Sequence, residues 1–376
     1  MANDKAASFF PNLQIVRGVA ALLVVVNHIY AKEVFFPSIT TLPFEHWFAN
    51  FGVTGLTLFF CLSGFLITSI LLKEKQHTNN IQIRSFYIRR ILRIWPLYFC
   101  LIILGQFILP FLIDSNFEGG NIQSCFTLKS LLYLAFLPNY VFFIFQPHNP
   151  FIDVTWSIGV EEQFYLFWPH FIKRIKSVLG ICIILIILQI IAEFTTTPLN
   201  AIKDSNLFYF LLNKLIKITE WSKAGYFALG AISAIIYNRN LHIKNSIIIR
   251  LVKYSPLLFA IAFILNMLYF FKGQFLLLAT AYIFLQIKLL QQTNMANNIL
   301  HRFFQWLGTI SYSMYLWHCF VIVLVYKGFS SIGNSHTATF TPLLYFIIIM
   351  LTVGISALSY QLIEKPFLRL KDRLNK

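Results

Sequence analysis

Long apolar stretches, separated by short polar ones, repeat along the whole chain of 376 residues. A helix needs ~20 mainly apolar residues to cross the ~30 Å hydrocarbon core of a bilayer, and eleven stretches come close to that length. They lie near 13–31, 48–72, 94–113, 130–147, 154–172, 177–193, 224–238, 254–271, 273–290, 304–326 and 340–363. Runs such as ICIILIILQII do not alternate apolar and polar residues, as the strands of a membrane β-barrel do. The pattern therefore predicts an all-α polytopic membrane protein.

The composition excludes the other broad classes of protein. Hydrophobic residues make up 58% of the chain and charged residues only 12%, about half of the ~25% typical of soluble domains. A soluble globule of this composition would lack a polar surface, and disordered chains are poor in the aromatic residues that make up 17% here. We find no repeat and no soluble domain, so we expect one membrane domain over 1–376 with its core at 13–367.

The charge distribution indicates the topology. The chain has 30 Lys and Arg against 14 Asp and Glu, a net charge of +16. If the stretch at 130–147, which Pro138 and Asn139 interrupt, does not cross, 22 of the 30 basic residues fall on one face. Basic loops favour the cytoplasmic side, so we predict ten transmembrane helices plus one re-entrant or interfacial segment, with both termini cytoplasmic. The excess charge then reflects orientation, and no nucleic-acid partner is expected.

The five cysteines do not indicate a metal site. Their positions are scattered, and none forms a C-x-x-C or Cys/His pattern with ligand spacing, so we expect no metal and interpret the cysteines as packing residues. They are Cys61, Cys100, Cys125, Cys182 and Cys319.

The first apolar segment carries two basic side chains, Arg17 and His28. Eleven residues is close to three helical turns, so both project from nearly one face, about 16 Å apart along the axis. A neutral imidazole within the membrane can accept a proton or activate a hydroxyl group. The alternative is a histidine that only hydrogen-bonds to a neighbouring helix, with Arg17 as an interfacial charge.

Two adjacent carboxylates, Glu161 and Glu162, lie deep in the segment TWSIGVEEQFYLFWP. Unpaired carboxylates there cost several kcal/mol, so each must be protonated, paired or hydrated. Adjacent residues on a helix do not share a face, which predicts that one glutamate faces a cavity and the other a structural partner. Their depth is similar to that of His28, so a His–Glu pair is possible; purely structural pairing is the alternative.

The basic segment RRILRIWPLY precedes the third predicted span. Arg90 and Arg93, three residues apart, share a helical face, whereas Arg89 points aside. Two guanidinium groups on a cytoplasmic face can bind phosphates in bidentate fashion. An anchor for lipid headgroups is the alternative.

Three further motifs carry polar groups into the membrane. Ser63 and Gly64 lie in FFCLSGFLIT, where close helix packing is one explanation and a functional Ser63 the other. The motif ISYSMYLWH places Tyr312, Tyr315 and His318 along one helical face, as site residues or as architecture. We interpret LIEKPF as the cap that ends the last span.

Taken together, these motifs and their order resemble the acyltransferase 3 family of integral-membrane O-acyltransferases, which modify cell-surface carbohydrates and some small molecules. The resemblance runs from Leu13 to Phe367 and rests on Arg17 with His28, FFCLSGFLIT, RRILRIWPLY, TWSIGVEEQFYLFWP, ISYSMYLWH and IEKPF. Members of the family have ten core helices. Two positions depart from the family pattern: Gln14 stands where many members have Asp, and Gly159 where many have Ser.

The resemblance implies roles for individual residues. His28 matches the essential histidine, a general base or acyl relay, and Arg17 is the basic residue paired with it. Arg90 and Arg93 match an R-x-x-R motif that meets the phosphates of acyl-coenzyme A. The remaining matches are the acidic pair Glu161 and Glu162, whose role is open, and Ser63, which could support the thioester of the donor. Tyr312, Tyr315 and His318 are expected to support the site or contact substrate.

These observations predict a bacterial inner-membrane enzyme that transfers an acyl group, with acetyl the expected one, from cytoplasmic acyl-CoA to a hydroxyl group of a carbohydrate. The acceptor is expected to be a lipid-linked glycan or another envelope sugar, and the bilayer and a homo-oligomer are further expected partners. Some relatives carry an additional SGNH esterase-like domain that we do not expect here. A proton-coupled small-solute transporter using the same His and Glu residues, and a non-catalytic membrane scaffold, are the rival hypotheses.

Overall fold

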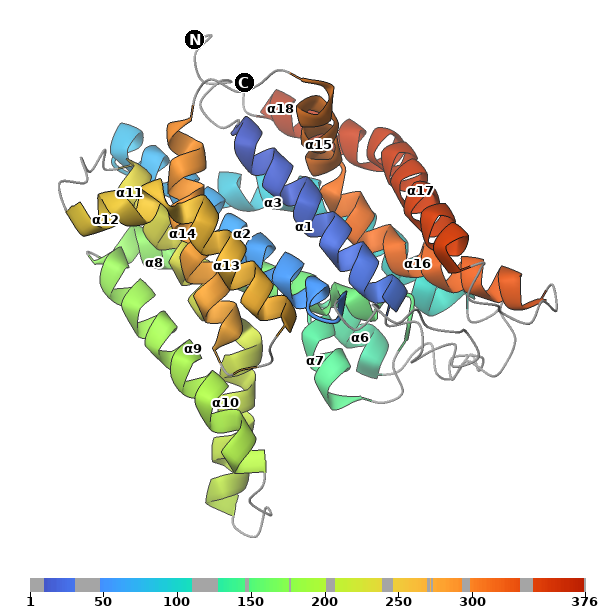
Figure 1. Cartoon of the computed structure of the whole chain (residues 1–376), viewed down its shortest axis with the longest axis horizontal. Coiled ribbons are helices and arrows are strands. Elements are labelled where there is room, and N and C mark those ends of the chain that lie inside the picture. The colour runs from blue at the N-terminus through green and yellow to red at the C-terminus, as the bar shows by residue number, and fades with distance from the viewer. Residues whose placement is uncertain are drawn as a thin grey trace. The chain divides into compact units, whose positions relative to one another are not determined.

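The structure is a computed structural model, and the residues that it describes are all helical or in short connections, with no strand among them. Figure 1 shows the chain as a set of long helices. The all-α prediction is therefore confirmed. The described residues are 10–30, 48–109, 128–145, 149–175, 177–200, 207–238, 246–268, 271, 273–292, 298–331 and 341–374.

The chain divides into two compact units. The first unit comprises residues 1–20, 53–81 and 164–305, and the second comprises 21–52, 82–163 and 306–376. Four helices contribute residues to both: α1 (Pro11–Tyr30), α2 (Phe51–Thr78, by its first two residues), α8 (Trp156–Arg174) and α15 (Ile299–Thr309).

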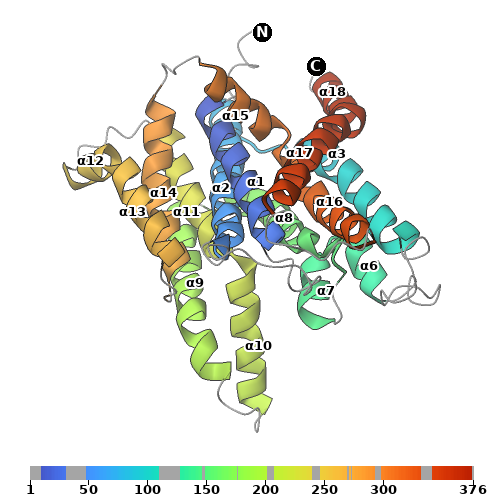
Figure 2. The same cartoon turned by 45° about the vertical axis from the view of Figure 1, so that its right-hand side comes forward.

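The first unit is built from apolar helices that pack side by side. α9 and α10 form a long helical hairpin in both views, and α13 and α14 lie against each other (Figures 1 and 2). Within α8, the Trp168 indole donates to Thr68 Oγ1 of α2 at 2.8 Å. The helices are α2 (Phe51–Thr78), α9 (Val178–Asn200), α10 (Leu207–Ser222), α11 (Ala224–Asn238), α12 (Ser246–Lys253), α13 (Ser255–Leu268) and α14 (Gln274–Gln291).

Two glycines allow α2 and α11 to touch backbone to backbone. A Cβ atom at Gly64 would lie 2.0 Å from the carbonyl oxygen of Phe227, and one at Gly230 would lie 1.9 Å from that of Cys61. Only residues without a side chain fit such a contact, which is typical of helix packing in membranes. The packing explanation of Gly64 is therefore supported by the structure.

The second unit carries most of the polar residues singled out in the sequence. α16 packs along α17, and α3 packs against α18 (Figure 2). α3 ends in a π-helical segment, η3, and α17 continues through a second one, η5. The elements are α3 (Ile83–Ile102), η3 (Ile103–Ile108), α6 (Leu128–Leu134), α7 (Pro138–Ile144), η4 (Asp153–Thr155), α16 (Ser311–Ser331), α17 (Thr341–Ser359), η5 (Tyr360–Glu364) and α18 (Lys365–Leu374).

Seven described helices are long and apolar enough to cross a membrane, and α12 with α13 would add an eighth if the pair, bent by 64°, is one span. The shorter α11 is also apolar. The stretch predicted not to cross, 130–147, contains α6 and α7, each of 7 residues. Seven helical residues rise only about 10 Å, so neither helix can span the bilayer. A multi-pass membrane protein follows, and the count of ten spans stays a prediction.

Two sequence-based boundaries were wrong, and one region between spans is helical. The region 194–223 lies between two predicted spans, and it contains the helix α10. The span expected at 304–326 is broken at Ile310 between α15 and α16. LIEKPF does not end the last helix, because the chain continues helically to Leu374. The reason is that Glu364 is buried and accepts a hydrogen bond from Ser313 of α16, which fixes this point of the helix to the unit although most of the motif is exposed.

Candidate active site

The polar face of α16 is fixed to its neighbours in the second unit by two tyrosines. The Tyr312 hydroxyl donates to the backbone carbonyl of Ile94 in α3 at 2.8 Å. The Tyr315 hydroxyl donates to the carbonyl of Val154 in η4, also at 2.8 Å. His318 follows one turn after Tyr315 and is fully buried. The predicted stripe is therefore real, and its tyrosines hold the helix that carries His318.

Tyr315 also contacts the start of α8. Its hydroxyl oxygen lies 2.7 Å from Ser157 Oγ. A carbonyl can only accept, so the tyrosine proton points to Val154 and Ser157 must donate to Tyr315. Both partners of the buried Tyr315 hydroxyl are thus defined, and η4, α8 and α16 are connected at one point.

His28 is half-buried on α1, and its hydrogen bonding defines its tautomer. Nδ1 lies 2.9 Å from the backbone carbonyl oxygen of Val24, one turn earlier on the same helix. Because that oxygen can only accept, Nδ1 carries the proton and Nε2 of the neutral ring has a free lone pair. A histidine in this state can accept a proton from a substrate hydroxyl.

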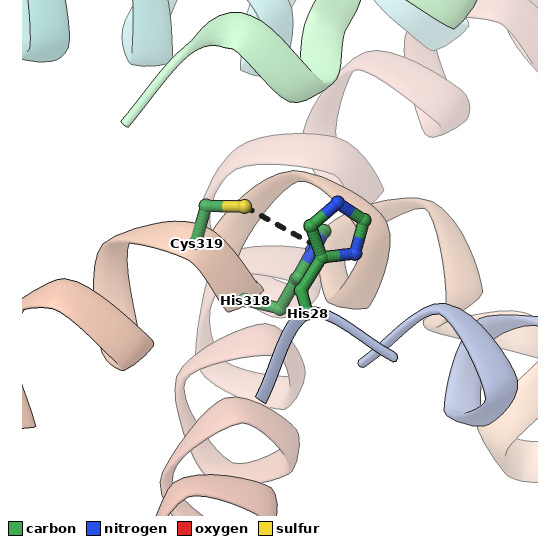
Figure 3. Close-up of side chains that lie close together, drawn as sticks. All are labelled: His28, His318 and Cys319. Carbon is green, nitrogen blue, oxygen red and sulfur yellow. Dashed lines mark hydrogen bonds between the residues drawn. The ribbon is translucent and has the colours of Figure 1, made fainter. Parts of the chain in front are cut away.

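The neighbour of His28 is a second histidine. The rings of His28 and His318 lie edge to face, with centroids 4.8 Å apart. Cys319 extends the cluster, since its Sγ atom is 3.3 Å from His318 Nε2. Figure 3 shows the three side chains pointing toward one another. The hydrogen bond of His28 goes to a backbone carbonyl, so among the described residues the His–Glu pair considered from the sequence is replaced by a His–His pair.

The two glutamates of α8 have different surroundings, as their adjacency predicts. Glu161 is half-buried and lies within electrostatic range of Tyr312 and Tyr315. Glu162 lies within electrostatic range of Arg90, with one carboxylate oxygen buried and without a hydrogen bond in the described structure. Both glutamates thus lie near Tyr312 of α16, with Glu162 exerting the larger effect on it. Glu161 also lies near Tyr315, and Glu162 lies near Arg90 of α3.

Three arginines of α3, Arg89, Arg90 and Arg93, are half-buried and differ in their contacts. Arg90 lies over the Phe86 ring, 5.6 Å from its centroid. Arg93 lies within electrostatic range of Tyr360 in η5. Arg89 points aside, as predicted, and donates to Ser85 Oγ at 2.6 Å. Arg90 and Arg93 thus remain candidates for an anionic ligand, and their role stays a prediction.

Arg17 and Ser63 belong to the first unit. Arg17 is half-buried on α1, eleven residues before His28. The Ser63 hydroxyl accepts a hydrogen bond from the Tyr165 hydroxyl at 3.1 Å. This contact ties α2 to α8, and a further role for either residue stays a prediction.

An acidic residue that the sequence did not single out lies near the histidine cluster. Asp153 is within electrostatic range of Cys319 and accepts a hydrogen bond from the Tyr133 hydroxyl at 3.0 Å. The backbone carbonyl of Tyr133 in turn accepts from Tyr98 at 2.7 Å. Burial, and then the negative charge of Asp153, raise the pKa of Tyr133 above its ordinary value, which keeps it a donor. The signal available in the sequence was an acidic residue two positions before the TWSIGVEEQFY motif.

Comparison with known proteins places the chain among acyltransferases. A family model described as an acyltransferase domain matches residues 10–361. YrhL of Bacillus subtilis, whose assignment as a peptidoglycan O-acetyltransferase is provisional, is 27% identical over 352 residues, which is 88% of this chain and 52% of that protein. A provisional O-acetyltransferase of Staphylococcus aureus (strain COL) is 28% identical over 384 residues, or 96% of this chain and 58% of that protein.

A further relative is the peptidoglycan O-acetyltransferase OatA of Listeria monocytogenes, 26% identical over 289 residues, which is 73% of this chain and 46% of that protein. The chain thus spans about half the length of these curated relatives. No solved structure matches it. The family match covers nearly the whole chain and includes every motif that the sequence singled out except IEKPF, which lies after residue 361. The chain belongs to the acyltransferase 3 family.

Proposed function

We propose that the protein is a membrane O-acyltransferase that transfers an acetyl group from acyl-CoA to a hydroxyl group of a cell-envelope carbohydrate. The named relatives include peptidoglycan O-acetyltransferases, so a lipid-linked or polymeric glycan is the acceptor class we favour. The donor that we propose is an acyl-CoA, because Arg90 and Arg93 on the cytoplasmic side can bind its phosphates.

The observation that carries the proposal is the state of His28. With Nδ1 committed to the Val24 carbonyl, Nε2 accepts the proton of the acceptor hydroxyl. The oxygen then attacks the thioester carbon, and the C–S bond breaks. The CoA thiolate leaves and takes the proton from Nε2, so the histidine returns to its starting state. A relay in which His28 carries the acyl group is compatible with the same geometry.

The donor is proposed to enter from the cytoplasm. In the ten-span topology with cytoplasmic termini, the segments around Arg90 and Arg93 face that side, and the charge attracts a polyphosphate. The pantetheine arm then extends into the membrane toward His28, and Glu161 with Tyr312 and Tyr315 supports the acceptor. The location is the inner membrane of a bacterium.

Replacing His28 tests the proposal. A general base contributes roughly 10²–10⁴-fold in rate, so His28→Gln should lower acetyl transfer by at least about 10²-fold. His77→Gln, at an exposed position near the end of α2, is the matched control and should retain activity. Transfer is measured as thiol release from acetyl-CoA by purified protein, and as acetyl ester on envelope glycans by mass spectrometry.

Folding must be checked in the same preparations. His28→Gln should elute from size exclusion and unfold thermally like the unmodified protein. If a folded His28→Gln variant transfers acetyl groups at the unmodified rate, the assignment of the base is wrong. A reporter fused to the C-terminus and active on one side of the membrane tests the topology independently, and an extracytoplasmic terminus would contradict it.

A further inference from the structure

Three side chains with metal-binding atoms converge in the second unit. His28 comes from α1, and His318 and Cys319 come from α16 (Figure 3). One donor atom from each residue can be chosen so that all three lie within 4.8 Å of one another. Imidazole nitrogen and thiolate sulfur are the ligands that zinc prefers. We propose that this cluster binds a single zinc ion, with three protein ligands and one open coordination position.

The groups behind the two histidines suit metal ligation. A metal-bound imidazole usually donates its other N–H to a carbonyl or carboxylate, which fixes the ring. His28 already does so through Nδ1 and the Val24 carbonyl, which leaves Nε2 for the ion. In His318 the nitrogen facing Cys319 is Nε2, and the carbonyl groups of Met314 and Tyr315 lie beside the ring. His28 can thus bind through Nε2 while the backbone holds its Nδ1. His318 can bind through Nε2, and its buried Nδ1 has no hydrogen-bond partner among the described residues.

The charge around the cluster also suits a divalent cation. A buried ion is tolerated only where nearby groups neutralise it. Zinc binding releases the Cys319 proton and leaves a thiolate, and the Asp153 carboxylate lies within electrostatic range of that sulfur. The two negative charges would match the charge of the ion. Cations that prefer oxygen ligands, such as Mg²⁺ and Ca²⁺, should not bind a site of two nitrogens and one sulfur.

Zinc binding has a consequence that rests on the proposed function. The Nε2 lone pair of His28 cannot bind zinc and accept a proton at the same time. Zinc and acyl transfer therefore compete for one atom, and zinc acts as an inhibitor whose removal restores the base. The sequence hides this site, because 290 residues separate His28 from His318.

Direct binding tests the site without any reference to activity. Purified protein in detergent, stripped with a chelator, is titrated with ZnCl₂ by calorimetry and analysed for bound metal. We expect one zinc per chain and no binding of MgCl₂. With CoCl₂ in place of zinc, a thiolate-to-cobalt charge-transfer band should appear. Cys319→Ser should weaken zinc binding at least about tenfold and remove the band. Cys61→Ser, a buried cysteine of α2 in the first unit, is the matched control and should keep both.

The outcomes separate this inference from the proposed function. Absence of stoichiometric zinc, or equal zinc affinity in folded Cys319→Ser, overturns the site even if acetyl transfer is normal. The competition is tested as the ratio of transfer rates with and without zinc within each variant, so a changed basal rate does not obscure it. Zinc should inhibit the unmodified protein, EDTA should reverse the inhibition, and Cys319→Ser should be less sensitive. Zinc that binds at Cys319 but accelerates transfer would overturn the competition.

Discussion

The close contact between α2 and α11 predicts that Gly64 cannot be replaced by a larger residue without loss of stability. A Cβ atom there would lie 2.0 Å from the carbonyl oxygen of Phe227, against an ordinary contact of 3.4 Å or more. The obstacle is backbone and cannot rotate away, so Gly64→Ala forces the helices apart by about 1.4 Å. Gly230 of α11 lies just as close to the Cys61 backbone of α2, so a separation of the two helices loosens both contacts.

The magnitude follows from two opposing effects. Alanine in place of glycine favours a helix by about 1 kcal/mol. Overpacking in a well-packed interior costs about 1–3 kcal/mol and occasionally more; because the whole crossing must open here, we expect a cost of about 2–4 kcal/mol before the helix-propensity gain is subtracted. We therefore expect Gly64→Ala to lower the free energy of unfolding by about 1–3 kcal/mol. For a unit of 150–250 residues, this lowers Tm by roughly 2–12 °C. The Ser63–Tyr165 hydrogen bond next to the crossing should weaken with it.

Two control glycines isolate the effect. A Cβ atom at Gly354 on α17 meets nothing within 4 Å, and one at Gly180 on α9 meets only the side chain of Ser177, with Oγ at 3.3 Å. Alanine at either position should leave Tm unchanged or raise it. Tm is measured for purified protein in one detergent by intrinsic tryptophan fluorescence. A Gly64→Ala variant as stable as Gly354→Ala would refute the packing argument.

Two further substitutions test the second unit. Tyr315→Phe removes the hydroxyl that joins Val154 to Ser157, and the buried groups left unpaired should lower the free energy of unfolding by about 1–3 kcal/mol. Tm and the initial rate of acetyl transfer should both fall. Unchanged values would show that this hydroxyl does not hold α16. Gly159→Ser places a Cβ atom 2.8 Å from Asn139 Oδ1. It should lower Tm, because Pro138 Cδ lies equally close to that Cβ atom, at 2.8 Å, and its ring cannot rotate away. A stable Gly159→Ser variant would show that α7 can move aside.

The sequence predicts the helices well because burial in lipid imposes a simple rule. Every apolar stretch of about 20 residues has to be helical to satisfy its backbone, so most segments correspond to one helix of the structure. The wrong boundaries are those that tertiary contacts decide. The burial of Glu364 against Ser313 carries the last helix past the point where its sequence turns polar. Nothing in the local sequence signals that contact.

Most residues of the candidate site were predicted from the sequence, but the contacts between them were predicted only in part. His28, Tyr315 and His318 were identified because polar groups within apolar segments are rare and costly. Their partners could not be predicted, since a pairing across 290 residues leaves no periodic signal. Cys319 was interpreted as a packing residue because no ligand spacing marks it in the sequence. Its Sγ contact with His318 depends on side-chain directions that the sequence does not specify.

The pairing that the structure shows for His28 is histidine with histidine, whereas the sequence also allowed a pairing with glutamate. A carboxylate in contact with an imidazole stabilises the protonated ring, which is the form that cannot accept a proton. His28 instead meets a backbone carbonyl and a second imidazole, and neither carries a negative charge that would hold a proton on the ring. The Asp153 carboxylate accepts a hydrogen bond from Tyr133. The ring then becomes charged only during the transfer step, when an alkoxide forms beside it and compensates its charge.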